Sequence, residues 1–332
     1  MTDLASTLEL TDLEPTAADM TALVLEGLAK PQKTLPTAFF YDESGSALFD
    51  EICRLPEYYP TRTELGIMQR SLPEMAEAVG PDALVLEYGS GTGIKTRRLL
   101  SALARPVAYV PVEISREFLM SSAEALQREF PALEVLPVCA DFTEPFEVPT
   151  PRQPERRRAL YFPGSTIGNF RPEFAVRLLR QMRDEVGRDG CALIGVDLVK
   201  DIDVLEAAYN DTAGITAQFN LNMLRRANDE LGADFDLGAF RHRAVWDARR
   251  NAIEMRLYAR RPTAVNVGGK RFTFETGEWI HTEDSHKYTL EGFHDLAHAG
   301  GFEVERVWTD EARYFSVQYL RVKGSTTAHR GR

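Results

Sequence analysis

The chain is poor in cysteine and in long apolar runs. Its 332 residues include three cysteines, Cys53, Cys139 and Cys191, which are odd in number and lie far apart in apolar surroundings. We expect reduced core cysteines, because a disulfide framework or a cysteine metal site needs several cysteines at short, regular spacings. No segment has the roughly 20 consecutive apolar residues that a membrane-spanning helix requires. The sequence therefore predicts neither a disulfide-stabilised protein nor a membrane protein, and it predicts no metal site.

The chain also lacks an excess of positive charge. Its formal net charge is −11 at pH 7, so it has no broad attraction to phosphate backbones or anionic membranes. We therefore expect no nucleic-acid partner and no membrane association. The first residues, MTDLASTLELTDLEPTAADM, are acidic and lack the basic start and apolar run of a signal peptide. These features predict a cytoplasmic protein.

One glycine-rich segment indicates a nucleotide-type ligand. Residues 83–93 read ALVLEYGSGTG: a short apolar run, an acidic residue, and three glycines at alternate positions. This pattern predicts a buried parallel strand and a tight turn, with Gly89 and Gly91 allowing backbone N–H groups to approach a ligand. A dinucleotide fingerprint places its third glycine one residue later, which disfavours an NAD-dependent dehydrogenase. The variant resembles the first motif of class I S-adenosylmethionine-dependent methyltransferases.

Apolar stretches alternate with helical patterns around this motif. That alternation is typical of a doubly wound, Rossmann-like α/β sheet. The expected strands are 83–87, 108–113, 134–138, 159–163 and 192–197, and the expected helices between them are 95–103, 115–130 and 172–186.

The pattern changes after residue 197. Beyond it we expect helices at 204–209 and 214–230 and antiparallel strands at 245–247, 252–260 and 270–275. A helix at 290–299 and strands at 303–308 and 315–322 would then complete the sheet. Near the start of the chain, a further helix is expected at 17–28. The sequence thus predicts a cofactor-binding methyltransferase domain, 61–199 plus 289–323. It also predicts a second, α+β substrate domain, 1–60 plus 200–288.

Four further residues are candidates for binding S-adenosylmethionine, because ligands of open α/β sheets bind outside the carboxyl ends of the strands. Glu113 ends the second strand, where an acid would accept hydrogen bonds from the ribose hydroxyls. Asp141 and Phe142 follow the third strand, where an acid can accept from the adenine amino group and a ring can stack. Lys95 lies just past the glycines and could pair with the carboxylate of the methionyl part.

Several long motifs support a more specific resemblance. From Leu35 to Val322, the chain closely resembles the histidine-specific N-methyltransferases of ergothioneine biosynthesis, on the motifs FFYDESGSALFDEICRLPEYYPTRTE, LEYGSGTGIKT, GSTIGN, GVDLVKD, AAYNDTAGITAQFN and HTEDSHKY. The resemblance implies S-adenosylmethionine-dependent trimethylation of the α-amino group of L-histidine to hercynine. L-Histidine and its mono- and dimethyl forms would be the small-molecule substrates. We expect a monomer that needs no metal.

The resemblance also implies which residues bind the substrate. Asn169, in GSTIGN, would hold the α-amino and carboxylate groups, since an amide can both donate and accept. Tyr58 and Tyr209 would assist it, and these three are the expected catalytic residues. Tyr41 and Met255 would complete the substrate site.

Glu283 and Ser285 are the expected readers of the imidazole ring. A neutral imidazole has one N–H donor and one bare nitrogen acceptor, so a carboxylate can accept from the first and a hydroxyl can donate to the second. On an extended segment, residues two apart point the same way. Phe49 and Phe219 are candidates for an aromatic lining that favours a quaternary ammonium product.

Asp284 departs from the family pattern, in which an apolar residue is more usual between the two ring-reading positions. If its side chain faced the pocket, it would affect substrate preference or the pH dependence of binding. Two alternatives remain at this point: α-N-methylation of another amino acid, and a non-catalytic protein that binds S-adenosylmethionine.

Overall fold

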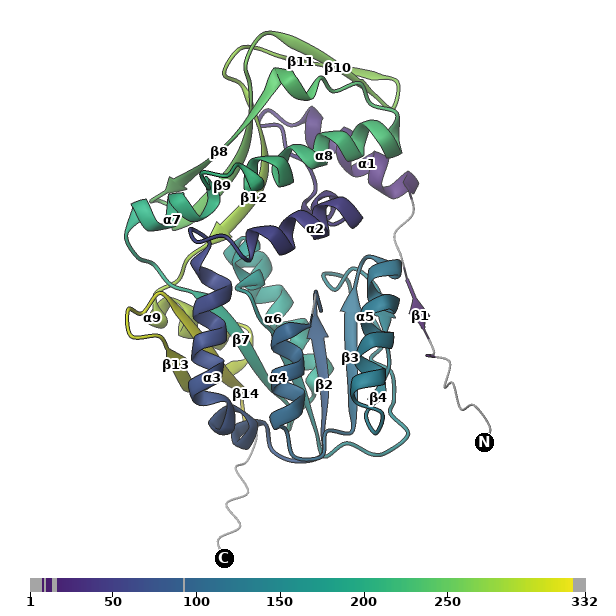
Figure 1. Cartoon of the computed structure of the whole chain (residues 1–332), viewed down its shortest axis with the longest axis vertical. Coiled ribbons are helices and arrows are strands. Elements are labelled where there is room, and N and C mark those ends of the chain that lie inside the picture. The colour runs from purple at the N-terminus through teal and green to yellow at the C-terminus, as the bar shows by residue number, and fades with distance from the viewer. Residues whose placement is uncertain (1–7, 9, 14–16, 92, 325–332) are drawn as a thin grey trace, which may run out of the picture.

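A large, mostly parallel sheet forms the lower part of the molecule (Figure 1). The computed structural model describes residues 8, 10–13, 17–91 and 93–324. The strand order is β1-β5-β3-β2-β6-β7-β14-β13, with the short β4 also beside β3. All neighbours are parallel except β14, which is antiparallel to both β7 and β13. This order confirms the predicted class I methyltransferase sheet. Its strands are β1 (Thr11–Asp12), β2 (Ala83–Tyr88), β3 (Ala108–Glu113), β4 (Glu134–Val135), β5 (Val138–Cys139), β6 (Arg157–Phe162), β7 (Cys191–Asp197), β13 (Phe302–Thr309) and β14 (Phe315–Val322).

Helices cover both faces of this sheet. Every residue of β2 is buried, and its side chains alternate between two hydrophobic clusters, one on each face. The helices on one face are α3 (Tyr59–Val79), α4 (Ile94–Ala102) and α5 (Arg116–Glu129), and those on the other are α6 (Pro172–Val186) and α9 (Leu290–Ala299). Burial on both faces explains why the central strands read as continuous apolar runs rather than as alternating patterns.

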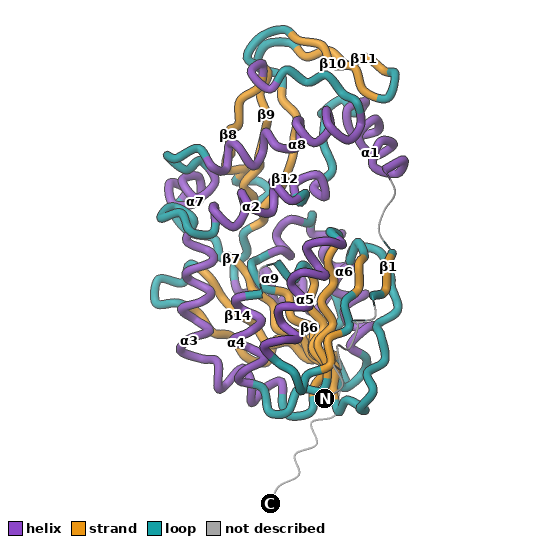
Figure 2. Tube along the Cα trace, turned by 45° about the vertical axis from the view of Figure 1, so that its right-hand side comes forward, coloured by secondary structure: helices purple, strands orange, loops and turns teal. Residues whose placement is uncertain are grey.

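A second, smaller unit lies over the carboxyl ends of the parallel strands, at the top of Figures 1 and 2. Its sheet has the order β12-β9-β8, and a separate hairpin pairs β10 with β11. These strands are β8 (Phe240–Asp247), β9 (Ala252–Ala259), β10 (Thr263–Val267), β11 (Lys270–Phe274) and β12 (Trp279–His286). The helices are α1 (Ala17–Ala29), α2 (Glu43–Ile52), α7 (Ile202–Tyr209) and α8 (Ile215–Leu231), and short 3₁₀ turns are η1 (Thr37–Phe40), η2 (Thr166–Asn169) and η3 (Leu237–Ala239).

The two units have separate cores but several chain connections. The hydrophobic cluster of the smaller unit draws on α1, α2, α7, α8 and its strands, whereas the two clusters of the large sheet flank β2. This separation supports the predicted division into 61–199 plus 289–323 and 1–60 plus 200–288, which stays a prediction. One detail differs from it, because β1 pairs with β5 at the edge of the large sheet.

Most predicted elements match the structure within a few residues, and the exceptions are informative. The stretch 134–138 forms two short strands, β4 and β5, instead of one. The sequence also missed β10 and treated β12 only as an extended segment. The reason for β12 is that its sequence, WIHTEDSH, is mostly polar. Its polar side chains are nevertheless largely buried, because they face partners rather than water.

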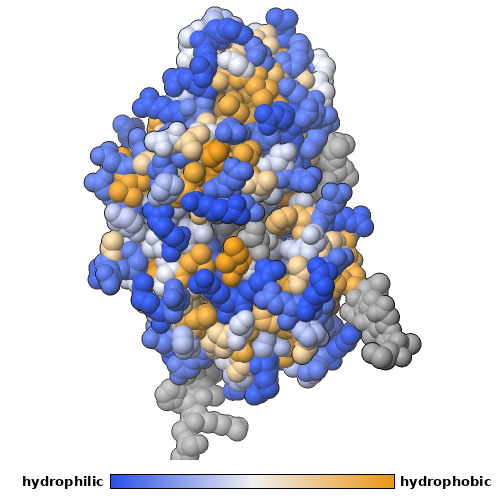
Figure 3. Space-filling model, in the orientation of Figure 1, coloured by the Kyte–Doolittle hydropathy of each residue, from blue (hydrophilic) through white to orange (hydrophobic). Residues whose placement is uncertain are grey.

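The described residues agree with the low content of cysteine and of apolar runs. No disulfide joins the three cysteines, all of which lie within the described residues; Cys139 and Cys191 are buried and Cys53 is half-buried. No helix within the described residues is both long enough and apolar enough to cross a membrane. Hydrophilic side chains cover most of the face seen in Figure 3.

Candidate active site

The predicted cofactor residues gather where β2 and β3 end. Gly89 and Gly91 have φ of +67° and +48°, a region that glycine enters without steric cost. The Glu113 carboxylate accepts from the backbone N–H of Ile114 at 2.9 Å. Burial raises the pKa of Glu113, against the backbone N–H groups of Ile114, Ser115 and Gly91, so the carboxylate lies at the glycine turn.

Two observations support a fit between this loop and S-adenosylmethionine. The hydroxyl of Ser90, inside the glycine loop, is buried and has no hydrogen-bond partner among the described residues. A buried polar atom without a partner is costly unless a ligand supplies one. The ring of Phe142 lies beside the same loop, since a side chain at Gly89 would meet it at 3.9 Å.

Asp141 and Phe142 lie just beyond β5, as the sequence predicts. The Phe142 ring stacks on Tyr88 with centroids 4.9 Å apart, and it is only partly buried. Asp141 Oδ1 accepts from the backbone N–H and the hydroxyl of Thr143, at 2.9 and 2.7 Å. The Asp141 carboxylate is thereby fixed at the start of the turn, beside the ring that is expected to face adenine.

Lys95 has a protein partner that the sequence did not indicate. Its ammonium forms an ion pair with the buried carboxylate of Glu64, which also accepts from the backbone N–H of Gly164 at 3.0 Å. Glu64, on α3, thus links Lys95 on α4 to the turn after β6. An ammonium has three N–H donors, so this pairing still allows a bond to a carboxylate of the cofactor.

The turn after β6 brings Asn169 against β12. Ser165 adopts φ of +60° there, and its hydroxyl accepts from the backbone N–H of Asp197 at 2.9 Å. Gly168 must lack a side chain, because a Cβ would lie 2.6 Å from the carbonyl oxygen of His286. This close approach lets the Asn169 amide nitrogen donate to Glu283 Oε1 at 3.1 Å.

Glu283 and Ser285 lie on β12, and each has a partner on another element. The partner of Glu283 is Asn169 of η2, and that of Ser285 is Tyr209 of α7. Glu283 is opposite Met255 in the β12–β9 register, and Met255 is buried. Burial raises the pKa of Glu283 to about 8, although Lys287 lowers it. Ser285 Oγ lies 2.8 Å from the hydroxyl of Tyr209 on α7. The structure therefore brings Asn169, Tyr209, Glu283 and Ser285 together.

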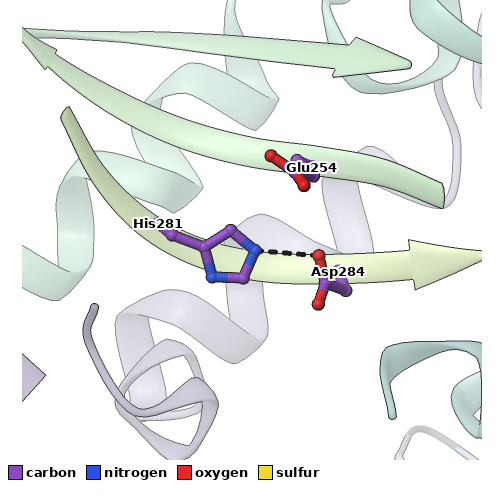
Figure 4. A group of neighbouring side chains, drawn as sticks. All are labelled: Glu254, His281 and Asp284. Atoms are coloured by element: carbon purple, nitrogen blue, oxygen red, sulfur yellow. Dashed lines mark hydrogen bonds and ion pairs between the residues drawn. The ribbon is translucent and has the colours of Figure 1, made fainter. Parts of the chain in front are cut away.

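Asp284 alternates with Glu283 and Ser285 along β12 and takes part in a different cluster, with His281 and Glu254 (Figure 4). His281 Nε2 lies 2.8 Å from Asp284 Oδ1, and Arg250 forms ion pairs with both Asp284 and Glu254. Burial would raise the pKa of Asp284, but His281 and Arg250 lower it to about 2. Glu254, His281 and Asp284 offer ligand atoms within 4.8 Å of one another, but Arg250 already supplies the cation at this cluster.

Aromatic rings form the remaining wall. Ring centroids lie 6.1 Å apart for Tyr58 and Tyr209, 6.3 Å for Phe49 and Tyr58, and 6.0 Å for Tyr41 and Phe219. Burial, followed by repulsion from Glu283 and Glu113, raises the pKa of Tyr41. Tyr41 is therefore near both the expected ring reader and the expected ribose acceptor.

A cavity of about 350 Å³ opens between the start of α6 and β12. Asn169, Glu283 and Asp284 line it, together with Leu35, His281 and Arg177 among others. Because its wall includes an expected amine-binding residue and one expected ring reader, it adjoins the predicted substrate site.

Sequence reasoning missed a buried charged group beneath these residues. Asp197, at the end of β7, pairs with Lys200 at 2.5 Å and Lys287 at 2.7 Å, and Tyr59 donates to it at 2.7 Å. Lys287 also donates to Tyr209 and Ser285. The spacing of Glu283, Ser285 and Lys287, each two residues apart on an extended segment, is a signal that could have identified Lys287.

Comparisons with known proteins agree with this geometry. The family model for histidine-specific, SAM-dependent methyltransferases matches residues 20–322. The chain is 43% identical over 300 residues to the histidine N-alpha-methyltransferase of Mycobacterium tuberculosis (strain CDC 1551 / Oshkosh), covering 89% of this chain and 92% of the relative. Identity to the protein of the same name from Mycolicibacterium smegmatis is 42% over 313 residues, covering 91% and 96%. Ergothioneine biosynthesis protein 1 of Neurospora crassa is 29% identical over 299 residues, which are 83% of this chain and 32% of that protein.

Proposed function

Because the chain belongs to the family of histidine-specific, S-adenosylmethionine-dependent methyltransferases, we propose that it methylates the α-amino group of L-histidine three times and releases hercynine. The names of its mycobacterial and fungal relatives support this substrate and a place in ergothioneine biosynthesis. The observation that carries the proposal is the convergence of Asn169, Glu283 and Ser285 at one site. A cytoplasmic location and a monomeric state remain predictions from the sequence.

The glycine loop and the residues after β3 and β5 hold the cofactor. Gly89 and Gly91 provide the turn. Glu113 would accept from the ribose hydroxyls, and Asp141 and Phe142, which lie just beyond β5, would contact the adenine. When bound, S-adenosylmethionine supplies a methyl group on a sulfonium, with a neutral thioether as leaving group. The main tasks left to the protein are proximity and orientation.

Residues from both units hold the substrate. Asn169 and the hydroxyls of Tyr58 and Tyr209 bind the α-amino and carboxylate groups, while Glu283 and Ser285 bind the ring. A carboxylate has about four acceptor positions, so Glu283 can keep its bond from Asn169 and still accept from an imidazole N–H. Substrates whose ring lacks either polar nitrogen would leave Glu283 or Ser285 without a partner, which is costly in a buried site.

The reacting amine must be neutral, and the tyrosines at the site do not act as anionic bases. Burial raises the pKa values of Tyr41, Tyr58 and Tyr209, the last against the attraction of Lys287. The hydroxyls of Tyr41 and Tyr58 can pass a proton to water while remaining neutral themselves. The buried cations Lys200 and Lys287 favour a neutral amine nearby, since like charges disfavour protonation. The rings of Phe49, Tyr58 and Phe219 suit the quaternary ammonium product.

Mass spectrometry on a competition mixture tests the proposal. The protein is incubated with S-adenosylmethionine and an equimolar mixture of the proteinogenic amino acids. We expect trimethylated histidine as the main product, with mono- and dimethylhistidine at early times. Methylation of another amino acid would contradict the substrate assignment. No product, together with intact binding of S-adenosylhomocysteine by calorimetry, would favour a non-catalytic binding protein.

A further inference from the structure

Lys287 lies directly beneath the residues that are expected to read the imidazole ring. It follows β12 and is two residues beyond Ser285, on the same side of the strand. Its side chain is 1% exposed, as is that of Asp197. The function proposed above gives it only an electrostatic effect on the substrate amine and no role in reading the ring. A fully buried ammonium is costly unless its bonds are all made.

All three N–H groups of Lys287 have partners. Nζ lies 2.7 Å from Asp197 Oδ2, 2.8 Å from Ser285 Oγ and 2.9 Å from the Tyr209 hydroxyl. An ammonium can only donate. Both hydroxyl oxygens must therefore accept from Lys287, and each spends one of its two lone pairs in doing so.

The two hydroxyls also bond to each other, at 2.8 Å. One of them donates in this bond and the other keeps its proton for a different acceptor. Tyr209 is the expected donor because a phenol is far more acidic than an alkyl alcohol, and Lys287 also lies over its ring at 4.9 Å from the centroid. Ser285 then accepts twice, from Lys287 and from Tyr209. Its only remaining capacity is to donate its own proton.

We propose that Lys287 is a positioning residue that makes Ser285 a donor only, so that the site selects a ring with an unprotonated nitrogen facing Ser285. This inference rests on the proposed function. It identifies the form of the substrate that is bound: a neutral imidazole, with its N–H toward Glu283 and its bare nitrogen toward Ser285.

The charges around Lys287 support this assignment. Burial would lower the pKa of Lys287, but Asp197 and Tyr209 hold it above its usual value, so the side chain stays cationic. Lys200 lies on the other oxygen of Asp197, and the group of Asp197, Lys200 and Lys287 has a net positive charge. A protonated imidazole facing Ser285 would find no lone pair there to donate to.

Substrate selectivity tests the proposal. It is a ratio of two kcat/KM values, and general damage to the fold lowers both values alike. We would measure kcat/KM for histidine and for 3-(pyrrol-2-yl)alanine, whose ring keeps an N–H but has no acceptor nitrogen. The wild-type enzyme should prefer histidine. Lys287→Met should reduce the ratio of the two values by about tenfold or more, because Ser285 is then free to accept as well as donate.

Lys200→Met is the matched control. It removes the other cation of the same buried group. Lys200 bonds to Asp197, to the Tyr59 hydroxyl and to the carbonyl of Leu198, but not to the hydroxyls of Ser285 and Tyr209. Its ratio should stay within about twofold of the wild-type value. A Ser285→Ala, Lys287→Met double variant should show the ratio of Ser285→Ala alone, because Lys287 acts through Ser285.

A spectroscopic measurement on the wild-type enzyme covers the case in which Lys287→Met does not fold. Nitrogen NMR of ring-labelled histidine, bound together with S-adenosylhomocysteine, reports the protonation of each ring nitrogen. One protonated nitrogen and one bare, hydrogen-bonded nitrogen would support the proposal. Two protonated nitrogens, or an unchanged ratio in Lys287→Met, would overturn it. If the wild-type enzyme does not methylate histidine, the proposed function itself fails.

Discussion

The amide nitrogen of Asn169 lies 3.1 Å from Oε1 of Glu283 and donates a hydrogen bond to it. The bond joins the turn after β6 of the large sheet to β12 of the smaller unit. The sequence assigns these residues to opposite ends of the substrate. Their contact means that the group expected to hold the amine also orients the carboxylate expected to read the ring.

Asn169→Ala should therefore impair both ends of substrate binding. We expect kcat/KM for histidine to fall about 100-fold, because hydrogen bonds to charged groups contribute about 1.5–3 kcal/mol each. Steady-state kinetics gives this value. Binding of S-adenosylhomocysteine should be unchanged by calorimetry, since the hydrogen bond of the Asn169 side chain within the described residues goes to Glu283 on β12. A kcat/KM near that of the wild type would remove Asn169 from the substrate site.

Glu283→Gln should change the pH dependence of catalysis. Burial raises the pKa of Glu283 to about 8, and the ionised form is the stronger acceptor for an imidazole N–H. We expect wild-type kcat/KM to rise with pH through about 8. The α-amino group of the substrate titrates in both enzymes, so the ratio of wild-type to variant kcat/KM isolates Glu283. A ratio that does not vary between pH 6 and pH 9 would contradict this role.

Glu283 should affect stability with the opposite pH dependence: its contribution to the stability of the fold falls as pH rises, whereas its contribution to catalysis grows. Because the pKa of Glu283 is raised on folding, its contribution to stability is fully present below about pH 4.5 and is lost as pH rises through about 8. The variant has no such titration. We expect the Tm of Glu283→Gln minus that of the wild type to increase between pH 5 and pH 8.5 in thermal melts. A constant difference would show that Glu283 titrates alike in the folded and unfolded chains.

Glu113→Gln should weaken cofactor binding without affecting the substrate site. An amide in place of the carboxylate loses the charge-assisted bonds that ribose hydroxyls would make, so we expect the Kd for S-adenosylhomocysteine to rise about tenfold by calorimetry. Glu117→Gln, in the first turn of α5 and exposed, is the matched control and should bind like the wild type. Equal affinities for the two variants would exclude Glu113 from the cofactor site.

Asp284→Asn should affect stability and leave selectivity alone. The Asp284 side chain bonds to Arg250 and His281 and alternates with Glu283 and Ser285 along β12. Asp284 also lines the cavity beside Glu283, but its carboxylate is already held by these two partners. Removing its charge from a buried cluster should cost about 1–3 kcal/mol in the free energy of unfolding, measured by urea denaturation. The preference for histidine over other amino acids should be that of the wild type. A changed preference would place Asp284 in the substrate site after all.

The sequence predicted the large sheet well because its central strands are buried on both faces. The run at 83–86 has no polar residue, so its period and length leave little ambiguity. The pattern of apolar residues could not identify β12, because Glu283 and Ser285 are polar although they are buried. Their burial depends on partners such as Asn169 and Tyr209, which lie far away in the sequence.

The candidate site was predictable in its residue types but not in its connections. The motifs supplied Asn169, Tyr58 and Tyr209, and the chemistry of imidazole supplied reasons for Glu283 and Ser285. The partners of Lys287 and Lys95 could not be predicted, because each bond joins elements that become neighbours only in the folded chain. The orientation of Asp284 follows from strand alternation, but only once β12 is known to be a strand.

Backbone hydrogen bonds join the carboxyl end of β7 to Tyr288, the residue that follows Lys287. Tyr288 donates its N–H to the carbonyl of Asp197 at 3.1 Å, and Val199 donates to the carbonyl of Tyr288 at 3.0 Å. The chain is thus hydrogen-bonded to the large sheet two residues after β12 ends. These bonds lie next to the Asp197–Lys287 pair. They join the ring-reading end of the substrate site to the sheet that carries the cofactor residues, so we expect these two parts to keep their relative position if the smaller unit moves.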